Sequence, residues 1–440
     1  QDREGNCQQA QGIFRDDESM NLIEDLRWRG LLAQTTDEAA LLEALKKPTT
    51  LYVGFDPTAP SLHAGNLVVL LVLRRFQLAG HNPIALVGGA TGLVGDPSGK
   101  NEERSLNSTE IVEAWVNRIR SQVSAFLDFN APKNPAVVVN NLDWTSPLSA
   151  IEFLRDIGKH FSVNQMLSKD SVSARLEGGG ISYTEFSYQV LQSYDFLELY
   201  RRNNCTLQVG GSDQWGNIVA GLDLIRRVEQ GSGHALTVPL LMKADGTKFG
   251  KTAGGSVWLD PEMTSPYAFF QFWLNSDDKD VINFLKVFSF KSHEEITELE
   301  KSHNENPGLR EAHRALAREL TSLVHTEETT QRVEAAARAL FGQGELSELD
   351  EATLASALAE LPRTTVSSKE EIPTWVDLLA ATGVVDSKSA ARRIVKEGGA
   401  YLNNQKISGE DFRPSKSDFL CGKYAVLRKG KRDLAAVELT

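Results

Sequence analysis

Between residues 51 and about 240, short runs of apolar and β-branched residues alternate with longer segments that have helical spacing. The run LVVLLVLRRF has no breaker before Gly80, which can serve as a C-cap, so residues 64–79 are expected to form a buried helix. Strands that alternate with helices predict an α/β domain with a parallel sheet, in which ligands bind at the carboxyl ends of the strands. The expected strands are LYVGF (51–55), PIALVGG (83–89) and PAVVVNN (135–141), and the helix between the last two is TEIVEAWVNRIRSQVSAFL (109–127).

The pattern changes after about residue 264. Strand-like runs disappear from 265–342, which is expected to be a helical domain, and residues 343–372 have the acidic and Ser/Thr/Pro-containing composition of a linker with some helix. Residues 373–440 return to a compact pattern of two short helices followed by strands. We therefore expect an α/β domain over 20–264, in front of these three segments. Residues 1–19 are expected to be an upstream extension that takes no part in the fold, because Met20 looks like a natural start.

Composition excludes several classes of protein. The hydrophobic content of 41% and charged content of 24% are those of a soluble globular protein, and no apolar run approaches the length of a membrane span. The three cysteines form no CxxC and the eight histidines show no paired-ligand spacing, so the sequence indicates neither a disulfide framework nor a zinc site. We expect a reducing, cytoplasmic location.

The net charge of −12 is unevenly distributed. Residues 373–440 contain twelve Lys and Arg against eight Asp and Glu, so this segment is basic while the rest of the chain is strongly acidic. An acidic body argues against general coating of nucleic acid, and a basic tail indicates that any contact with nucleic acid is local.

The first candidate site is DPTAPSLHAGN (56–66), directly before the predicted helix at 64–79. His63, Gly65 and Asn66 would lie at the helix N-terminus, where free amides and the helix dipole favour anions. A second is LVGGATGLVGDPSGKNEER (86–104), which is not a P-loop because Val94 and Asn101 replace the required glycine and Ser/Thr.

Three further segments could contribute chemistry. In TEFSYQVLQSYDFLELY (184–200), Tyr188, Gln192 and Asp195 share one helix face, and they either form an internal polar network or bind a ligand. Asp213 in LQVGGSDQWGN follows a strand and two glycines, as ribose-binding or turn aspartates do. The segment KADGTKFGKTAGG (243–255) reads as a glycine-rich loop whose lysines either close over a developing charge or face solvent.

Together these motifs resemble the class I aminoacyl-tRNA synthetases, and among them the bacterial tyrosyl enzymes. HAGN at 63–66 is similar to the HIGH motif and KFGKT at 248–252 is similar to KMSKS. GKHFSVNQML, TEFSYQVLQSYDF and GGSDQWGN also resemble this family, and AATGVVDSKSAARRIVKEGGAYLNNQKI resembles its ribosomal-protein-type RNA-binding module. The resemblance extends from about residue 20 to the end of the chain.

The resemblance implies a Rossmann-like catalytic domain, a helical anticodon-binding domain and a small α+β RNA-binding domain. It also implies that the tyrosine carboxylate attacks the α-phosphate of ATP, and that the tyrosyl group then passes to the terminal ribose of tRNA(Tyr). ATP would be a substrate used with Mg²⁺, with no permanently bound cofactor, no metal site and no membrane contact. The enzyme would work as a homodimer in the cytoplasm.

The resemblance also implies a role for each matching residue. The pyrophosphate end of ATP would contact Thr58, His63, Lys100, Arg104, Lys248, Lys251 and Thr252. The α-ammonium group of tyrosine would contact Asp96, Tyr188 and Gln192, and its phenolic hydroxyl would contact Tyr52 and Asp195. The rest of ATP would lie against Gly54, Asp56, Gly65, Asn66, Gly211, Asp213, Gln214 and Lys251.

The chain departs from the family pattern at two motifs. Asn66 replaces the last histidine of HIGH, and Phe249 and Gly250 replace the Met and Ser of KMSKS. Three alternatives stay open at this point: a tryptophanyl-tRNA synthetase, a small-molecule nucleotidyltransferase and a non-catalytic RNA-binding relative. Tyr52, Asp195 and the basic tail favour tyrosine over tryptophan, and the presence of His63 and the loop lysines favours an enzyme.

Overall fold

The computed structural model describes residues 21–98, 107–177, 179–252, 255–430 and 432–440. The chain divides into two compact units. One contains the residues up to Met263 together with Ser276–Leu316, and the other contains Thr264–Asn275 together with Ala317–Thr440. The expected extension at 1–19 and the candidate residues Lys100 and Arg104 lie outside the described residues.

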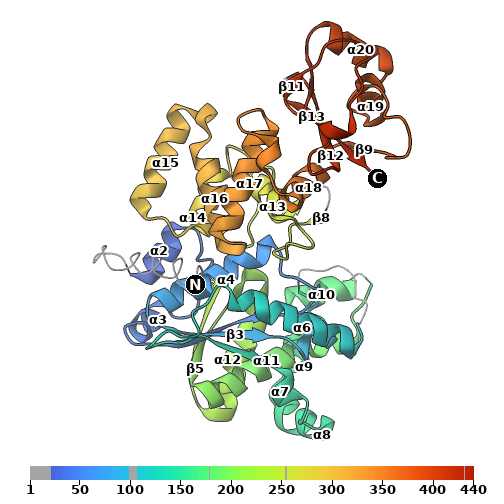
Figure 1. Ribbon diagram of the computed structural model, residues 1–440. Coiled ribbons are helices and arrows are strands. Elements are labelled where there is room, and N and C mark those ends of the chain that lie inside the picture. The colour runs from blue at the N-terminus through green and yellow to red at the C-terminus, as the bar shows by residue number, and fades with distance from the viewer. Residues whose placement is uncertain (1–20, 99–106, 178, 253–254, 431) are drawn as a thin grey trace. The chain divides into compact units, whose positions relative to one another are not determined.

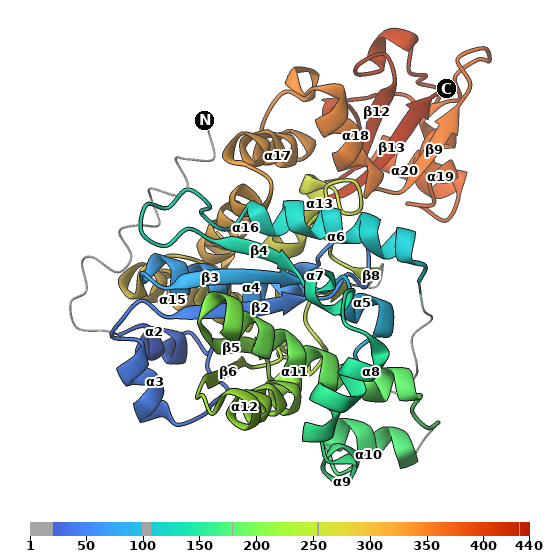
Figure 2. The ribbon, with the colours of Figure 1, turned by 90° about the horizontal axis from the view of Figure 1, so that it is seen from below.

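The first unit is built on a six-stranded sheet with the order β1-β6-β5-β2-β3-β4. Strand β1 is antiparallel to β6, and all other neighbouring strands are parallel. This sheet confirms the expected α/β fold. Figure 2 shows the successive strands β4, β3, β2, β5 and β6 side by side. The strands are β1 (Gln34–Thr35), β2 (Thr50–Phe55), β3 (Asn82–Val87), β4 (Val137–Asn140), β5 (Cys205–Gly211) and β6 (His234–Val238).

Helices cover both faces of this sheet. Figure 1 shows α4 and α6 on one side and α11 and α12 on the other. The chain passes from β2 to β3 and β4 and then returns to the opposite side of β2 with β5 and β6, so the strand order reverses between β2 and β5. Ligands of open parallel sheets bind beside this reversal, at the carboxyl ends of the strands. The helices around the sheet are α2 (Leu22–Trp28), α3 (Glu38–Ala44), α4 (Ala64–Leu78), α5 (Thr91–Val94), α6 (Thr109–Ser124), α7 (Leu142–Thr145), α8 (Ala150–Glu152), α9 (Val163–Leu167), α10 (Asp170–Glu177), α11 (Tyr183–Asn203) and α12 (Trp215–Glu229).

Helix α4 confirms the helix predicted at 64–79. It is buried along most of its length because its apolar residues face both the sheet and the helices above it. The helix ends at Ala79, and Gly80 follows with a φ of 94°, a left-handed conformation that favours glycine.

The region predicted to be helical contains five α-helices, and the division between the two units falls within one of them, α16. A sixth helix, α18, follows in the expected linker. The helices are α13 (Pro266–Leu274), α14 (Val281–Phe288), α15 (His293–Glu305), α16 (Glu311–Val324), α17 (Glu327–Leu340) and α18 (Glu351–Ala359).

The C-terminal part of the second unit is a five-stranded sheet with the order β11-β10-β12-β13-β9. Its core contains apolar side chains from α19, α20 and the strands, around Trp375. Strand β9 lies inside the stretch 343–372, which was expected to be a linker with some helix, and pairs in parallel with β13. Its sequence RTTV gave no apolar alternation, because it is a short edge strand without a buried face. The elements are β9 (Arg363–Val366), α19 (Trp375–Ala381), α20 (Lys388–Lys396), β10 (Ala400–Leu402), β11 (Gln405–Lys406), β12 (Tyr424–Lys429) and β13 (Asp433–Leu439).

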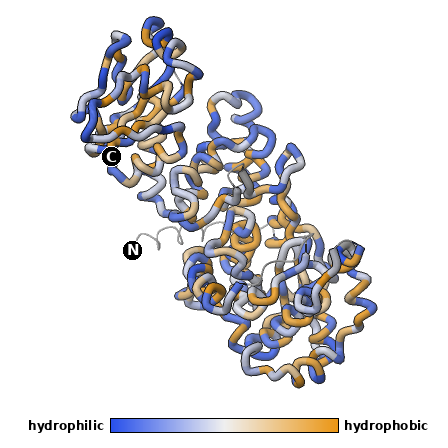
Figure 3. The backbone as a smooth tube through the Cα atoms, turned by 90° about the vertical axis from the view of Figure 1, so that its right-hand side faces the viewer, coloured by the Kyte–Doolittle hydropathy of each residue, from blue (hydrophilic) through white to orange (hydrophobic). Residues whose placement is uncertain are grey.

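Hydrophobic and hydrophilic stretches are mixed along the whole chain, as the orange and blue of Figure 3 show. Within the described ranges, no helix is both long enough and apolar enough to cross a membrane.

Candidate active site

A cavity of about 420 Å³ opens at the carboxyl ends of β2 and β5, where the strand order reverses. Its size lies within the range of small-molecule sites. Most of the residues selected from the sequence line this one cavity. They are Tyr52, Gly54, Asp56, His63, Gly65, Asn66, Asp96, Tyr188, Gln192, Asp195, Gly211, Asp213, Gln214 and Lys248.

The other five residues selected from the sequence are not among the described residues that line the cavity. Thr58 is exposed in the loop after β2 and is not part of the cavity lining. Lys251 and Thr252 form the short strand β7, opposite β8 (Gly255–Ser256), but their side chains are outside the described part of the structure, as are Lys100 and Arg104.

His63 is the N-cap of α4. Its Nδ1 accepts a hydrogen bond from the Gly65 amide at 3.0 Å, and its own amide donates to Oδ1 of Asn66 at 3.0 Å, so the two residues form a capping box. With Nδ1 an acceptor, the ring proton of neutral His63 is on Nε2. A side chain at position 65 would collide with the His63 ring, since a Cβ there would lie 2.8 Å from Cε1. Gly65 is therefore needed for the folded-back histidine.

The KFGKT segment lies directly beside this helix start. The Ala64 amide donates to the Val257 carbonyl at 2.8 Å, and the Val257 amide donates to the Gly250 carbonyl at 3.1 Å. Phe249 is buried against the rings of Phe284 and Phe288, with centroid distances of 5.0 and 5.2 Å. The aromatic residue that replaces Met in this motif thus anchors the loop beside His63.

Asp195 on α11 also lines the cavity and is 2% exposed. Its Oδ1 accepts a hydrogen bond from Nε1 of Trp144 at 2.8 Å, and its Oδ2 accepts one from Nδ2 of Asn141 at 2.9 Å. Burial raises the pKa of Asp195 to about 7, although these two hydrogen bonds act in the opposite direction. The carboxyl is therefore held in a fixed orientation with a proton that it can lose near neutral pH.

Tyr52 on β2 lies close to Asp195. Its hydroxyl is buried and has no hydrogen-bond partner within the described residues. The pKa of Tyr52 is raised well above its usual value by burial and by the negative charge of Asp195, so the hydroxyl stays protonated. A buried polar group without a partner needs an explanation, and in a cavity the explanation can be a ligand that supplies the hydrogen bond. The cavity can therefore bind a polar ligand group beside Tyr52 and Asp195.

Hydrogen bonds connect the polar residues in the middle of the cavity. The Tyr188 hydroxyl donates to Asp56 Oδ2 at 2.6 Å, and Gln214 Nε2 donates to Asp96 Oδ2 at 2.7 Å. Gln192 accepts a hydrogen bond from Nδ2 of Asn217 at 3.0 Å. Two carboxylates, Asp56 and Asp96, thus face the same space, which suits a cationic ligand group.

Sequence reasoning missed the residues that support the site. Asn141 and Trp144 hold Asp195, and Thr91 donates to Asp56 Oδ1 at 2.6 Å. Asn141 could have been found, because it directly follows the strand PAVVV and strand ends in such sheets carry ligand-facing residues. Trp144 gave no such signal.

The sequence motifs imply tyrosine as the ligand of this cavity, and on that expectation Trp144→Phe should weaken its binding about tenfold, because a hydrogen bond to a carboxylate contributes about 1.5 kcal/mol or more. The loss of this donor should also move the pKa of Asp195 further above about 7. Equilibrium dialysis with labelled tyrosine measures the effect. Trp28→Phe is the control, since Trp28 does not line the cavity but stacks on His293. An unchanged dissociation constant in Trp144→Phe would show that the indole does not support the site.

Residues 44–342 match the family model "tRNA synthetases class I (W and Y)", and residues 353–437 match the model of a tyrosine–tRNA ligase C-terminal domain. The tyrosine–tRNA ligase of Streptomyces avermitilis is 62% identical over 423 residues, which cover 96% of this chain and 99% of the relative. That of Thermobifida fusca is 58% identical, covering 95% and 99%.

Solved structures give the same fold. The chain is similar to a C-terminally truncated mitochondrial tyrosyl-tRNA synthetase from Aspergillus nidulans, with a TM-score of 0.66, 30% identity, and coverage of 77% of this chain and 99% of that one. A tryptophanyl-tRNA synthetase from Plasmodium falciparum also matches, with a TM-score of 0.51, 14% identity, and coverage of 76% and 88%. The fold alone therefore does not separate tyrosine from tryptophan, and that distinction rests on the relatives with 58–62% identity.

Proposed function

Because this chain belongs to the tyrosine–tRNA ligases of the class I (W and Y) family, we propose that the cavity between β2 and β5 is the site where tyrosine is activated. As a tyrosine–tRNA ligase, it uses L-tyrosine, ATP and tRNA(Tyr) as substrates. The observation that carries the assignment is the orphaned Tyr52 hydroxyl beside the buried carboxyl of Asp195.

In this proposal the phenolic hydroxyl of tyrosine donates to Asp195 and accepts from Tyr52. Both groups are buried, so a substrate without a hydroxyl leaves them unsatisfied and loses binding energy. The α-ammonium group lies against Asp96, Tyr188 and Gln192, and the carboxylate of Asp56 adds negative charge through its bond to Tyr188. The tyrosine carboxylate then points toward His63 and the ATP site.

ATP lies along the rest of the cavity, with its ribose at Asp213 and its adenosine against Gly54, Gly211 and Gln214. The tyrosine carboxylate oxygen forms a bond to the α-phosphorus, while the bond to the bridging oxygen of pyrophosphate breaks. The departing charge is stabilised by the cluster proposed from the motifs, which is Thr58, His63, Lys100, Arg104, Lys248, Lys251 and Thr252. Mg²⁺ enters with the ATP phosphates as part of the substrate.

Equilibrium binding without ATP tests the amino-acid site. Tyrosine should bind with a measurable dissociation constant, and phenylalanine should bind much more weakly. Tyr52→Phe should reduce the difference between the dissociation constants of tyrosine and phenylalanine. Equal binding of tyrosine and phenylalanine by the unmodified protein would refute the assignment of Tyr52 and Asp195.

We also propose that residues 373–440 contact tRNA. The support is the excess of basic residues in this segment, including Arg392, Arg393 and Lys396 on α20.

The free thiols of Cys205 and Cys421 fit the reducing cytoplasm that the composition indicated.

A homodimer is proposed from the exposed apolar side chains of the first unit. Among the described residues, six of thirteen exposed large hydrophobic side chains fall within 151–183, which points to a protein contact in this segment. They are Ile151, Leu154, Val163, Leu167, Leu176 and Tyr183.

The double variant Ile151→Asp/Tyr183→Asp should sediment as a monomer at micromolar concentration, whereas the unmodified protein should sediment as a dimer. Both side chains are 70% exposed, so the substitutions leave the core intact. Leu309→Asp is the matched control, because Leu309 is also exposed and apolar but lies outside the segment. A monomeric unmodified protein, or a variant that stays dimeric, would refute this interface.

A further inference from the structure

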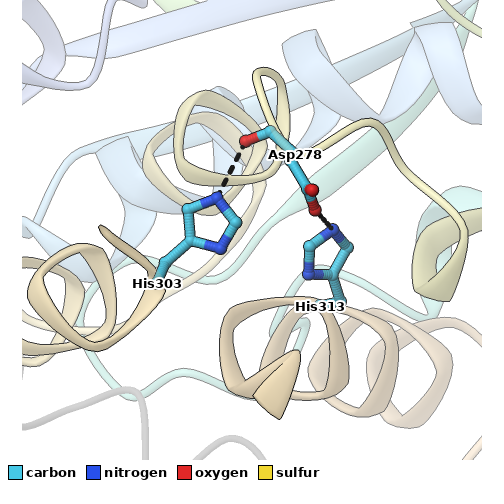
Figure 4. Close-up of side chains that lie close together, drawn as sticks. All are labelled: Asp278, His303 and His313. Carbon is cyan, nitrogen blue, oxygen red and sulfur yellow. Dashed lines mark hydrogen bonds and ion pairs between the residues drawn. The ribbon is translucent and has the colours of Figure 1, made fainter. Parts of the chain in front are cut away.

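A cluster of side chains of the types that bind metal ions lies in the first unit. Its three residues do not line the cavity. Asp278 in the loop before α14, His303 on α15 and His313 on α16 come together there (Figure 4). One nitrogen or oxygen atom from each residue lies within 4.8 Å of those of the other two. His313 is fully buried and His303 is 9% exposed, while the side chain of Asp278 is 62% exposed.

Backbone carbonyls fix the protonation of both imidazole rings. Nε2 of His303 lies 3.0 Å from the carbonyl oxygen of Asp278, and Nε2 of His313 lies 3.1 Å from that of Ser276. A carbonyl oxygen can only accept a hydrogen bond, so each Nε2 is the protonated nitrogen. In each neutral ring, Nδ1 therefore carries a lone pair.

Neither lone pair accepts a hydrogen bond from a donor among the described residues. Nδ1 of His303 and Nδ1 of His313 are both buried without a hydrogen-bond partner among the residues described. Figure 4 shows these nitrogens on the facing sides of the two rings. Two buried lone pairs that face each other are unfavourable unless an electrophile lies between them.

We propose that His303, His313 and Asp278 bind a divalent transition-metal ion, for which Zn²⁺ is the best match. Two neutral imidazoles and a carboxylate are ligands that zinc prefers. In the structure Oδ1 of Asp278 lies 3.2 Å from Nε2 of His313, so the carboxylate would turn toward the two Nδ1 atoms to become the third ligand, and its exposed side leaves room for water as a fourth. Ca²⁺ and Mg²⁺ are disfavoured because they require sets of oxygen ligands. The hydrogen bonds from Nε2 to carbonyls match the outer contacts that orient metal-binding histidines.

The ion would join three segments of the first unit that are otherwise separate in sequence. It would link the loop at 276–280 to α15 and to the first turn of α16. Because ion binding favours the folded state, zinc should raise the melting temperature of the protein. This site is independent of tyrosine activation, so either proposal can fail without the other.

The test is a zinc titration of the full chain after removal of metal with a chelator, in competition with a chromophoric chelator. We expect one saturable site per chain, with affinity reduced roughly 100-fold or more in His303→Gln and roughly tenfold or more in Asp278→Asn. Asp277→Asn is the matched control, since Asp277 is the adjacent exposed carboxylate and is outside the cluster. Asp277→Asn should bind zinc with the same affinity as the unmodified chain.

Co²⁺ provides a second measurement on the same variants. Its absorption spectrum should lack a thiolate charge-transfer band, which separates this site from binding at cysteines such as Cys421. Absence of saturable binding, equal affinity in His303→Gln and the unmodified chain, or a thiolate band that accounts for the bound ion would each overturn the proposal.

Discussion

Asp195→Asn should lower kcat/KM for tyrosine about 100-fold, which corresponds to about 2.7 kcal/mol. The carboxylate accepts from Trp144 and Asn141, and an amide cannot accept from both without turning its NH₂ group toward a donor. The substituted residue would also offer the substrate hydroxyl a weaker, uncharged partner. Steady-state activation kinetics measure the loss.

Asp143→Asn is the control for this substitution, because Asp143 is an exposed carboxylate one residue from Trp144 and does not line the cavity. Its kinetics should be unchanged. A normal kcat/KM for tyrosine in Asp195→Asn would remove Asp195 from the amino-acid site.

The raised pKa of Asp195 predicts that both stability and tyrosine affinity depend on pH. Burial raises the pKa of Asp195 to about 7 in the folded protein from an ordinary value of 3.8. The stability that this group contributes is therefore fully present below about pH 4 and is lost as the pH rises to about 7. Tyrosine should bind the ionised carboxylate, so its affinity should increase about tenfold between about pH 6 and about pH 8.

Tyrosine titrations between about pH 6 and about pH 8 test whether the affinity increases with pH, as predicted. Asp195→Asn should abolish the dependence, because the amide does not titrate in this range. An affinity that is constant in the unmodified protein, or that falls as the pH rises, would contradict the proposed ionised acceptor.

His63→Asn should slow adenylate formation roughly 100-fold and leave the dissociation constant of tyrosine nearly unchanged. Asparagine is a good N-cap and can accept from the Gly65 amide in place of Nδ1, but it lacks the second ring nitrogen, Nε2, which we propose contacts the phosphates. This substitution therefore separates the role of His63 in capping α4 from its role in catalysis. Single-turnover formation of tyrosyl-adenylate is the measurement.

His63→Ala provides the comparison. It should show a similar loss of rate and a decrease of about 1 kcal/mol in the free energy of unfolding, because the cap is lost as well. If tyrosine affinity fell as much as the rate in either variant, His63 would not act mainly on the transition state.

Much of the fold could be predicted from sequence, because it follows from local patterns. The alternation of strands and helices predicted the parallel sheet, and the unbroken apolar run predicted α4. The motifs also identified 14 of the 29 residues that line the cavity, since strand ends and helix starts converge at one edge of such a sheet.

The remaining features depend on contacts between distant segments. The pairing of Trp144 with Asp195 depends on how α7 and α11 pack, and neither sequence carries a sign of the other. The same applies to β9, which becomes a strand only by pairing with β13, and to Phe249, which packs against α14. His303 and His313 have no recognised ligand spacing, so only the fold brings them together.

The most direct test of the tyrosine site is pyrophosphate exchange into ATP, with Mg²⁺, measured in parallel for tyrosine, tryptophan and phenylalanine. The proposed site predicts exchange that depends on tyrosine, is lost on chelation of Mg²⁺, and is strongly reduced in Asp195→Asn. Comparable exchange with phenylalanine or tryptophan, or full exchange in Asp195→Asn, would contradict the assignment of this cavity to tyrosine.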